Sequence, residues 1–294
     1  MKSILITAFV LYSLCARAQS VTSELTSDRP TSILLGKISE ESLLEPPFRD
    51  WYQKNYEAYS PDQNTIDNFS EALKAYSITV FMGSWCGDSK REVPTFFKIL
   101  HQADFPMSAL TLVAVDRAPD SYKQSPGGEQ EGLNIHRVPT FIFNKNGKEV
   151  GRISERPVVS MENDILSMLK GEYIPRYAGV TTVDNLLKEN GAENFLEIAK
   201  ARLPKLKEQL EHRYELNTYA KVLVSLNKMP EAIAVFELNT LLFPEDTGTF
   251  LSLANTLGIA GDKERAISNY RKVLQLDPKN REAISGINFL NSKI

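Results

Sequence analysis

The hydrophobic pattern of the first half of the chain alternates between two periods. Short β-rich runs occur at residues 33–38, 78–82, 110–115, 141–143 and 150–153. Apolar residues with helical spacing lie between or after them, at residues 65–76, 90–102 and 159–169. Asn146-Gly147 separates the last two runs and is a strong two-residue hairpin signal. Strand, helix and strand followed by a hairpin and a helix predict an α/β unit with a mixed sheet.

From about residue 172 the pattern becomes almost entirely helical, and it repeats. Pro244 and Pro278 lie 34 residues apart, each just after an amphipathic stretch. Counting back from each proline aligns two sets of apolar positions: Leu216, Tyr219, Ala220, Leu223, Ala232 and Phe236 with Phe250, Leu253, Ala254, Leu257, Ala266 and Tyr270. This period resembles the tetratricopeptide repeat, in which alanines let paired helices approach closely. Residues 281–293 would then form the capping helix.

Composition and charge narrow the classes of function. The chain has 294 residues, of which 42% are hydrophobic and 24% charged, with a formal net charge of -3. This balance permits sizeable cores and gives no sign of disorder. Nucleic-acid binding requires a basic surface that faces the phosphates, so the small negative net charge argues against a nucleic-acid partner.

The first eighteen residues have the features of a signal peptide. Lys2 supplies the positive region, residues 4–14 form a short apolar stretch, and Ala16-Arg17-Ala18 is a small-x-small cleavage pattern. The mature protein would begin near residue 19 and be periplasmic or extracellular. Cys15 raises the alternative of a lipoprotein, although Leu14 stands where lipid attachment requires a small residue. No later segment is apolar enough for a transmembrane helix.

Removal of this peptide would leave one thiol, because the chain contains two cysteines, Cys15 and Cys86. In an oxidising compartment spare cysteines normally become paired. A single remaining cysteine is therefore either a small buried hydrophobe or a residue kept for chemistry. The sequence around Cys86 decides between these two interpretations.

Cys86 stands in the segment Trp85-Cys86-Gly87-Asp88-Ser89-Lys90, directly after an apolar strand and at the start of a helix. Pro94 follows eight residues later, and Val138-Pro139-Thr140 precedes the next apolar strand. Together with the hairpin, these motifs resemble the thioredoxin superfamily, and in particular a bacterial exported group with a Cys-Gly-Asp-Ser centre. The resemblance implies a thioredoxin fold, a nucleophilic Cys86 and a cis bond before Pro139.

Elementary chemistry independently favours a reactive sulfur at this position. A cysteine at a helix N-terminus faces unpaired backbone N–H groups and the positive end of the helix dipole, which favour the thiolate over the thiol. We expect Ser89, one turn along, to offer its hydroxyl to the sulfur. Lys90 and Arg91 add positive charge, which Asp88 opposes.

Two departures from thioredoxins change the expected mechanism. Ser89 occupies the position of their second, resolving cysteine, so a mixed disulfide has no internal thiol to release it. Val80 occupies the position of the buried acid that they carry six residues before the nucleophile. Ordinary dithiol reductase activity is therefore not expected.

These inferences define a site and five segments. Cys86 and Ser89 are the predicted catalytic residues, and the predicted substrate contacts are Trp85, Gly87, Asp88, Val138 and Pro139. No cofactor or metal is predicted, because His101, His136 and His212 lack metal-ligand spacing. The segments are the signal peptide (1–18), a lead-in (19–32), the thioredoxin-like domain (33–172), a linker with connecting helices (173–212) and two tetratricopeptide repeats with a cap (213–294).

The sequence supports a monothiol protein that forms or rearranges mixed disulfides on exported clients through Cys86, as an oxidoreductase or isomerase of the single-cysteine type. Whether it turns over as an enzyme stays open, because a non-catalytic adaptor with a peptide-binding repeat domain is the alternative. The Cys-Gly-x-Ser pattern also occurs in monothiol glutaredoxins, but export and Trp85 favour the thioredoxin side. Peroxidase chemistry would require a Pro/Thr environment that Cys86 lacks.

Overall fold

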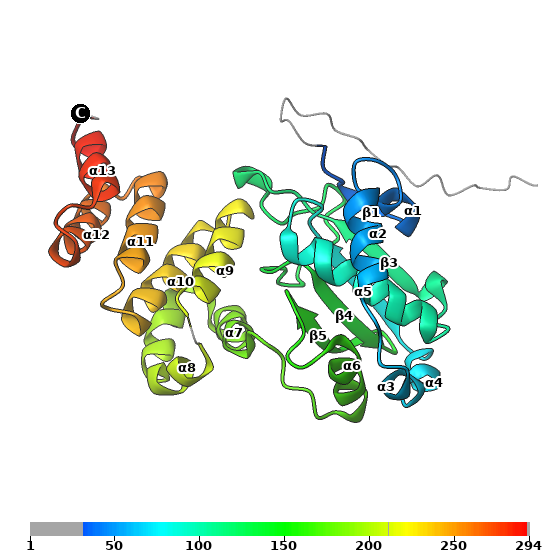
Figure 1. The fold of residues 1–294 in the computed structure, drawn as a ribbon. Coiled ribbons are helices and arrows are strands. Elements are labelled where there is room, and N and C mark those ends of the chain that lie inside the picture. The colour runs from blue at the N-terminus through cyan, green and yellow to red at the C-terminus, as the bar shows by residue number, and fades with distance from the viewer. Residues whose placement is uncertain (1–31, 211, 293–294) are drawn as a thin grey trace, which may run out of the picture.

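The computed structural model describes residues 32–210 and 212–292, and it contains a mixed sheet followed by a row of helices (Figure 1). The strands are β1 (Gly36–Ile38), β2 (Ser77–Met82), β3 (Leu110–Ala114), β4 (Thr140–Lys145) and β5 (Lys148–Ser154). Their order is β1-β3-β2-β4-β5, with β2 parallel to β3 and the other neighbours antiparallel. The α/β prediction with a mixed sheet is thus confirmed.

The hairpin between β4 and β5 follows from its two turn residues. Asn146 and Gly147 have φ values of 53° and 74°. Both are positive, as a two-residue turn that matches the strand twist requires, and asparagine and glycine adopt such values at least cost.

In the described part of the chain the sheet is accompanied by α1 (Glu40–Leu43), α2 (Arg49–Ala58), α3 (Gln63–Asp67), α4 (Ser70–Leu73), α5 (Gly87–Gln102) and α6 (Met161–Lys170). The prediction of one helix over residues 65–76 is wrong, because the chain leaves the helical conformation at Phe69 and forms α3 and α4 instead. The four apolar residues with helical spacing are nevertheless buried, namely Ile66, Phe69, Leu73 and Tyr76. Two short helices here bury the same positions that one long helix would bury. The hydrophobic spacing alone therefore could not distinguish these two structures.

The two faces of the sheet are covered differently. Side chains alternate along β2, so Ile78, Val80 and Met82 join the core formed with the helices. Phe81 points the other way and packs with Val113 and Ile142 beneath residues 115–139. That covering segment contains only a 3₁₀ turn, Pro119–Ser121, and is otherwise irregular.

The helical region comprises α7 (Ala178–Lys200, with a break at Gly191), α8 (Leu203–Gln209), α9 (Tyr214–Ser225), α10 (Met229–Leu242), α11 (Thr247–Ala260), α12 (Lys263–Leu276) and α13 (Arg281–Ser292). Both ends of α12 lie 34 residues after those of α10. The small and aromatic positions are buried in register, as Ala232 and Phe236 are in α10 and Ala266 and Tyr270 in α12. The helical domain therefore has the predicted tetratricopeptide-type architecture.

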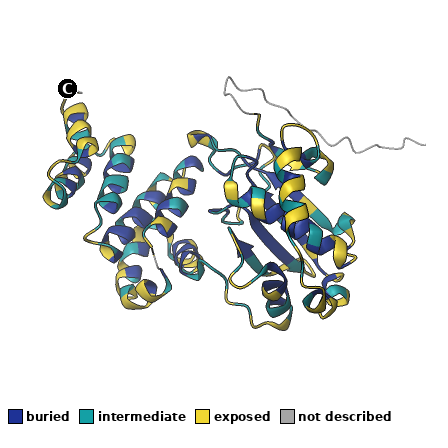
Figure 2. Ribbon diagram, viewed as in Figure 1, coloured by how far each residue is buried: buried dark blue, intermediate teal, exposed yellow. Residues whose placement is uncertain are grey.

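Segment 173–212, predicted as a linker with connecting helices, takes part in the helical core. Val180, Val183 and Phe195 of α7 are fully buried in the same cluster as α9 and α10. Figure 2 shows the buried parts of these helices on the sides that face neighbouring helices. No helix in the described ranges has the length and apolar character needed to cross a membrane.

The helical region contacts the sheet domain through segment 115–139. The Gln124 side chain donates a hydrogen bond to the Ser225 carbonyl at 2.7 Å, and the Ser225 hydroxyl donates to the Tyr122 carbonyl at 3.2 Å. Arg137 donates to the Tyr214 carbonyl at 3.4 Å. The irregular segment thus lies between the sheet and α9, and it carries Val138 at its end.

Candidate active site around Cys86

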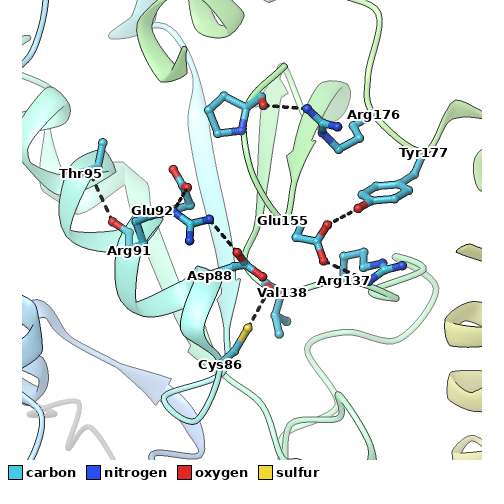
Figure 3. Close-up of polar contacts among 11 residues, drawn as sticks. Cys86, Asp88, Arg91, Glu92, Thr95, Arg137, Val138, Glu155, Arg176 and Tyr177 are labelled. Carbon is cyan, nitrogen blue, oxygen red and sulfur yellow. Dashed lines mark hydrogen bonds and ion pairs between the residues drawn. The ribbon is translucent and has the colours of Figure 1, made fainter. Parts of the chain in front are cut away.

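Cys86 is the N-cap residue of α5 and is half-buried. Its backbone is extended (φ −90°, ψ 129°), its N–H donates to the Gly83 carbonyl, and its own carbonyl accepts the helical bond from Lys90. The Sγ atom donates to the Val138 carbonyl at 3.3 Å, as Figure 3 shows. The sulfur therefore lies between the start of a 16-residue helix and the segment that precedes Pro139.

The Val138-Pro139 peptide bond is cis, as the resemblance implied. The Pro139 carbonyl accepts a hydrogen bond from the Glu155 N–H at 2.7 Å, which joins this loop to the end of β5. Val138 is buried in the cluster beneath segment 115–139, and Cys86 packs against that cluster. The structure thus brings together Cys86, Val138 and Pro139.

Trp85 forms a wall beside the cysteine. Its indole N–H donates to the Val115 carbonyl at 2.9 Å, and its ring lies 6.3 Å from the Tyr122 ring. Gly83 is required at the preceding turn, because a Cβ there would come within 2.7 Å of the indole. The predicted role of Trp85 as a substrate contact is compatible with this placement.

The contact made by Ser89 differs from the expected contact with sulfur. Its hydroxyl oxygen accepts a hydrogen bond from the Gly83 N–H at 3.1 Å, and the residue is fully buried. Ser89 therefore ties the first turn of α5 to the end of β2. Gly87 is exposed, and Asp88 pairs with Arg91 at 2.6 Å along the helix surface. The positive charge of Arg91 is thus partly neutralised.

Sequence reasoning missed a polar cluster on the far side of the Val138 loop. Arg137 pairs with Glu155 at 3.0 Å and lies 4.9 Å from the Tyr177 ring centroid. The Tyr177 hydroxyl donates to Glu155 as well (Figure 3). These three residues join the loop before Pro139, the end of β5 and the approach to α7. None of them belongs to a recognisable motif, because they are far apart in the sequence.

A second missed residue is Lys123, which the sequence presents as an ordinary loop lysine. It is only 4% exposed, and its Nζ donates to the His136 carbonyl at 2.6 Å. The pKa of Lys123 is lowered from 10.5 to about 7, chiefly by burial and also by Arg137, while a Cys86 thiolate acts in the opposite direction. A buried cation of this kind lies beside segment 136–138, which also accepts the hydrogen bond from Cys86.

His136 does not form a catalytic pair with Cys86. Its ring packs between Tyr177 and Tyr219, at 5.7 and 6.3 Å, where the helical region meets the sheet domain. Burial lowers the pKa of His136 to about 3, so the ring is neutral at pH 7. Across residues 32–210 and 212–292 no group of three or more histidine, cysteine or acidic side chains is arranged to hold a metal ion.

Comparison with known proteins identifies the domain that contains Cys86. A family model described as Thioredoxin matches residues 48–166. "Putative thioredoxin-5" of Dictyostelium discoideum is 30% identical over 112 residues, which cover 38% of this chain and 99% of that protein. The chain belongs to the thioredoxin family. The thioredoxin match includes Cys86 and Pro139 and ends within α6.

Among solved structures, the second TPR domain of human RPAP3 in complex with an HSP70 peptide aligns with a TM-score of 0.28 and 17% identity. The alignment covers 40% of this chain and 96% of that domain. Within the thioredoxin match, the departures noted from the sequence are visible in the structure. Ser89 and Val80 are both fully buried, and neither supplies a thiol or an acid.

Proposed function

We propose that this protein carries out thiol–disulfide exchange as an exported monothiol member of the thioredoxin family. The observation that supports this most is the position of the Cys86 sulfur. It is half-buried at the N-terminus of α5 and contacts the Val138 carbonyl beside the cis bond to Pro139. A helix start is a typical position for a nucleophilic cysteine, and the adjacent backbone offers a client segment a place to pair.

In this proposal the Cys86 thiolate attacks one sulfur of a client disulfide. A new S–S bond joins Cys86 to the client, and the other client sulfur leaves as a thiolate that then takes a proton. Because Ser89 cannot attack the mixed disulfide, an external thiol or a second client thiol must release it. The second case produces isomerisation of the client. Trp85, Gly87, Asp88, Val138 and Pro139 would form the surface that the client contacts, and Ser89 would hold the helix start.

Export is part of the proposal and rests on the sequence of residues 1–18, which lie outside the described residues. Its measurement is the N-terminal sequence of the protein recovered from the cell envelope or medium. We expect it to begin near Gln19. An intact Met1 in protein found only in the cytosol would contradict export.

Reactivity of Cys86 toward a small disulfide tests the chemistry. The mature protein is incubated with glutathione disulfide at pH 7, and the adduct is followed by intact mass. The same chain unfolded in urea is the matched control, because it holds the same single thiol without the helix start. We expect the folded protein to react at least about tenfold faster. Equal or slower reaction of the folded protein would contradict a nucleophilic role.

Isomerisation of a client tests whether this reactivity is productive. We expect the mature protein to accelerate recovery of a small secreted protein with scrambled disulfides, and Cys86→Ser to lose this effect. Equal isomerisation activity of wild type and Cys86→Ser would contradict the exchange function.

A binding role for the helical domain is the second candidate, and exposed apolar side chains near the end of the stack favour it. Ile259 of α11 is 72% exposed, and Phe289 of α13 is 57% exposed. Large apolar side chains on a surface can serve as contacts for a partner. Partners that remain bound to Cys86→Ala under reducing conditions would support an adaptor. Partners captured only through a disulfide would oppose it.

A further inference from the structure

The fold places one buried lysine, Lys123, in the segment that covers the Cys86 side of the sheet. A tight loop directs it inward, because the Asp116 and Gln124 backbones pair with each other and the Lys123 N–H donates to the Asp116 carbonyl at 2.9 Å. Lys123 itself has a positive φ of 59°. This is uncommon for a residue other than glycine, so the surrounding structure must hold it there.

Packing around Lys123 excludes water. Its Nζ lies 4.4 Å from the centroid of the Tyr122 ring, and that ring lies against Trp85, the neighbour of Cys86. Ser225 of α9 holds the residues on both sides of the lysine, through the Tyr122 carbonyl and the Gln124 side chain. The helical domain therefore contributes directly to the burial of this amine.

The ion pairs of the described residues include no carboxylate partner for Lys123. Asp116, at the base of the same loop, accepts hydrogen bonds from the Ser121 hydroxyl and from two backbone N–H groups. Arg137 and Lys221 face the amine with positive charge. Glu155 is the acid that faces it, and Glu155 is paired with Arg137.

The remaining group that faces the amine is Cys86. Among the charges that favour the protonated lysine, a Cys86 thiolate has a larger effect on the pKa of Lys123 than Glu155 has. The geometry gives the reason, since Lys123 donates to the His136 carbonyl and Cys86 donates to the Val138 carbonyl of the same short segment. The amine and the sulfur thus both donate hydrogen bonds to backbone carbonyls of segment 136–138.

We propose that Lys123 is a positioning residue for Cys86, in which the buried ammonium is the charge partner of the thiolate. This inference rests on the proposed function and adds a residue to it. When the thiolate attacks a disulfide, the S–S bond forms at Cys86 and the negative charge moves to the leaving client sulfur. The ammonium lies opposite this charge before and during the step. It supplies a buried ionisable group on the loop-covered face of the sheet, opposite the face on which Val80 lies.

The pH profile of Cys86 alkylation tests the pair. The mature full-length protein, Lys123→Met, Lys123→Arg and the surface control Lys221→Met react with iodoacetamide from pH 5 to pH 10. Iodoacetamide is uncharged, so the lysine does not attract the reagent itself. We expect Lys123→Met to react about tenfold more slowly at pH 7, with the midpoint of its profile about one pH unit higher. Lys123→Arg should stay within about threefold of wild type, and Lys221→Met within about twofold.

Equal rates and midpoints in wild type and Lys123→Met would overturn the proposal. So would a Lys123→Arg variant that is folded and as slow as Lys123→Met, because that result would mean that shape rather than charge matters. A reciprocal measurement does not depend on the folding of a lysine variant. In reduced protein with isotope-labelled lysines, we expect Lys123 to titrate at lower pH in Cys86→Ser than in wild type. An unchanged titration would overturn the pair.

These measurements separate the inference from the exchange function. Alkylation requires no disulfide, so a coupled profile without any glutathione adduct would keep the pair and reject exchange. A fast adduct with an unchanged profile in Lys123→Met would keep exchange and reject the pair.

Discussion

The two faces of the sheet differ in what covers them and in what they bury. Helices cover one face, where Phe96, Phe141 and Phe143 are fully buried and in ring contact. The carboxylates that α6 buries, Glu162 and Asp164, accept hydrogen bonds. The irregular segment 115–139 covers the other face, and it buries Lys123 and His136. Cys86 stands at the edge of this second face.

This difference indicates where the molecule gives up stability for chemistry. A buried amine and a buried imidazole cost free energy that an apolar cover would not cost. The helical domain also packs on this face, through Ser225 and the rings beside His136. We infer that the helix-covered face maintains the fold and that the loop-covered face maintains the site.

The largest expected effect is a loss of stability caused by a substitution in the core of the helix-covered face. Phe96→Ala removes a fully buried ring 4.6 Å from Phe141 and should lower the free energy of unfolding by about 3 to 5 kcal/mol. Both tryptophans, Trp51 and Trp85, lie in the sheet domain, so their fluorescence in a urea titration reports this domain. Ile259→Ala is the exposed control and should change stability by less than about 0.5 kcal/mol. A loss under about 1 kcal/mol in Phe96→Ala would contradict the inference that the helix-covered face maintains the fold.

The next effect has the opposite sign. Lys123→Met should raise the free energy of unfolding at pH 7 by about 2 kcal/mol, because it removes a buried amine. The pKa of Lys123 is lowered from 10.5 to about 7 on folding, so the unfolded chain binds more protons between these values. Wild-type stability therefore rises with pH through this window, and the advantage of the variant should shrink by pH 10. A destabilised Lys123→Met, or an advantage independent of pH, would count against this account.

The burial of His136, on the loop-covered face, predicts that the protein loses stability at acidic pH. Its pKa is about 3 in the folded protein and 6.5 ordinarily, so the unfolded chain binds more protons between these values. Stability should fall as pH drops through this window, and His136 should account for about 2 kcal/mol of the fall by pH 5. Urea titrations at pH 7 and pH 5 measure it. The fall should be smaller by that amount in His136→Phe.

The smallest effect concerns the contact between α9 and the covering segment. Ser225→Ala removes the hydroxyl that donates to the Tyr122 carbonyl and should cost about 0.5 to 1.5 kcal/mol. Because the Gln124 bond to the Ser225 backbone remains, Cys86 alkylation at pH 7 should change by less than about threefold. A tenfold change would show that this single hydroxyl controls the site.

The parts of the molecule that could be predicted are those formed by residues close together in the sequence. The cysteine, its strand and its helix are contiguous, and Val138-Pro139 carries a motif of its own, so this half of the site was visible in the sequence. The buried position of Lys123 was not visible, because segment 115–139 has no period from which burial could be inferred. The contact of Ser89 with Gly83 was missed because a serine at a helix start has several partners within reach.

The most direct test of the monothiol mechanism is the fate of the mixed disulfide. Wild type, Ser89→Cys and the control Ser89→Ala are loaded with glutathione at Cys86, the free reagent is removed, and the bound fraction is followed by mass. We predict that wild type and Ser89→Ala keep the adduct until an external thiol is added. Ser89→Cys should release it by itself at a rate independent of protein concentration. Spontaneous release from wild type at the same rate as from Ser89→Cys would contradict the mechanism.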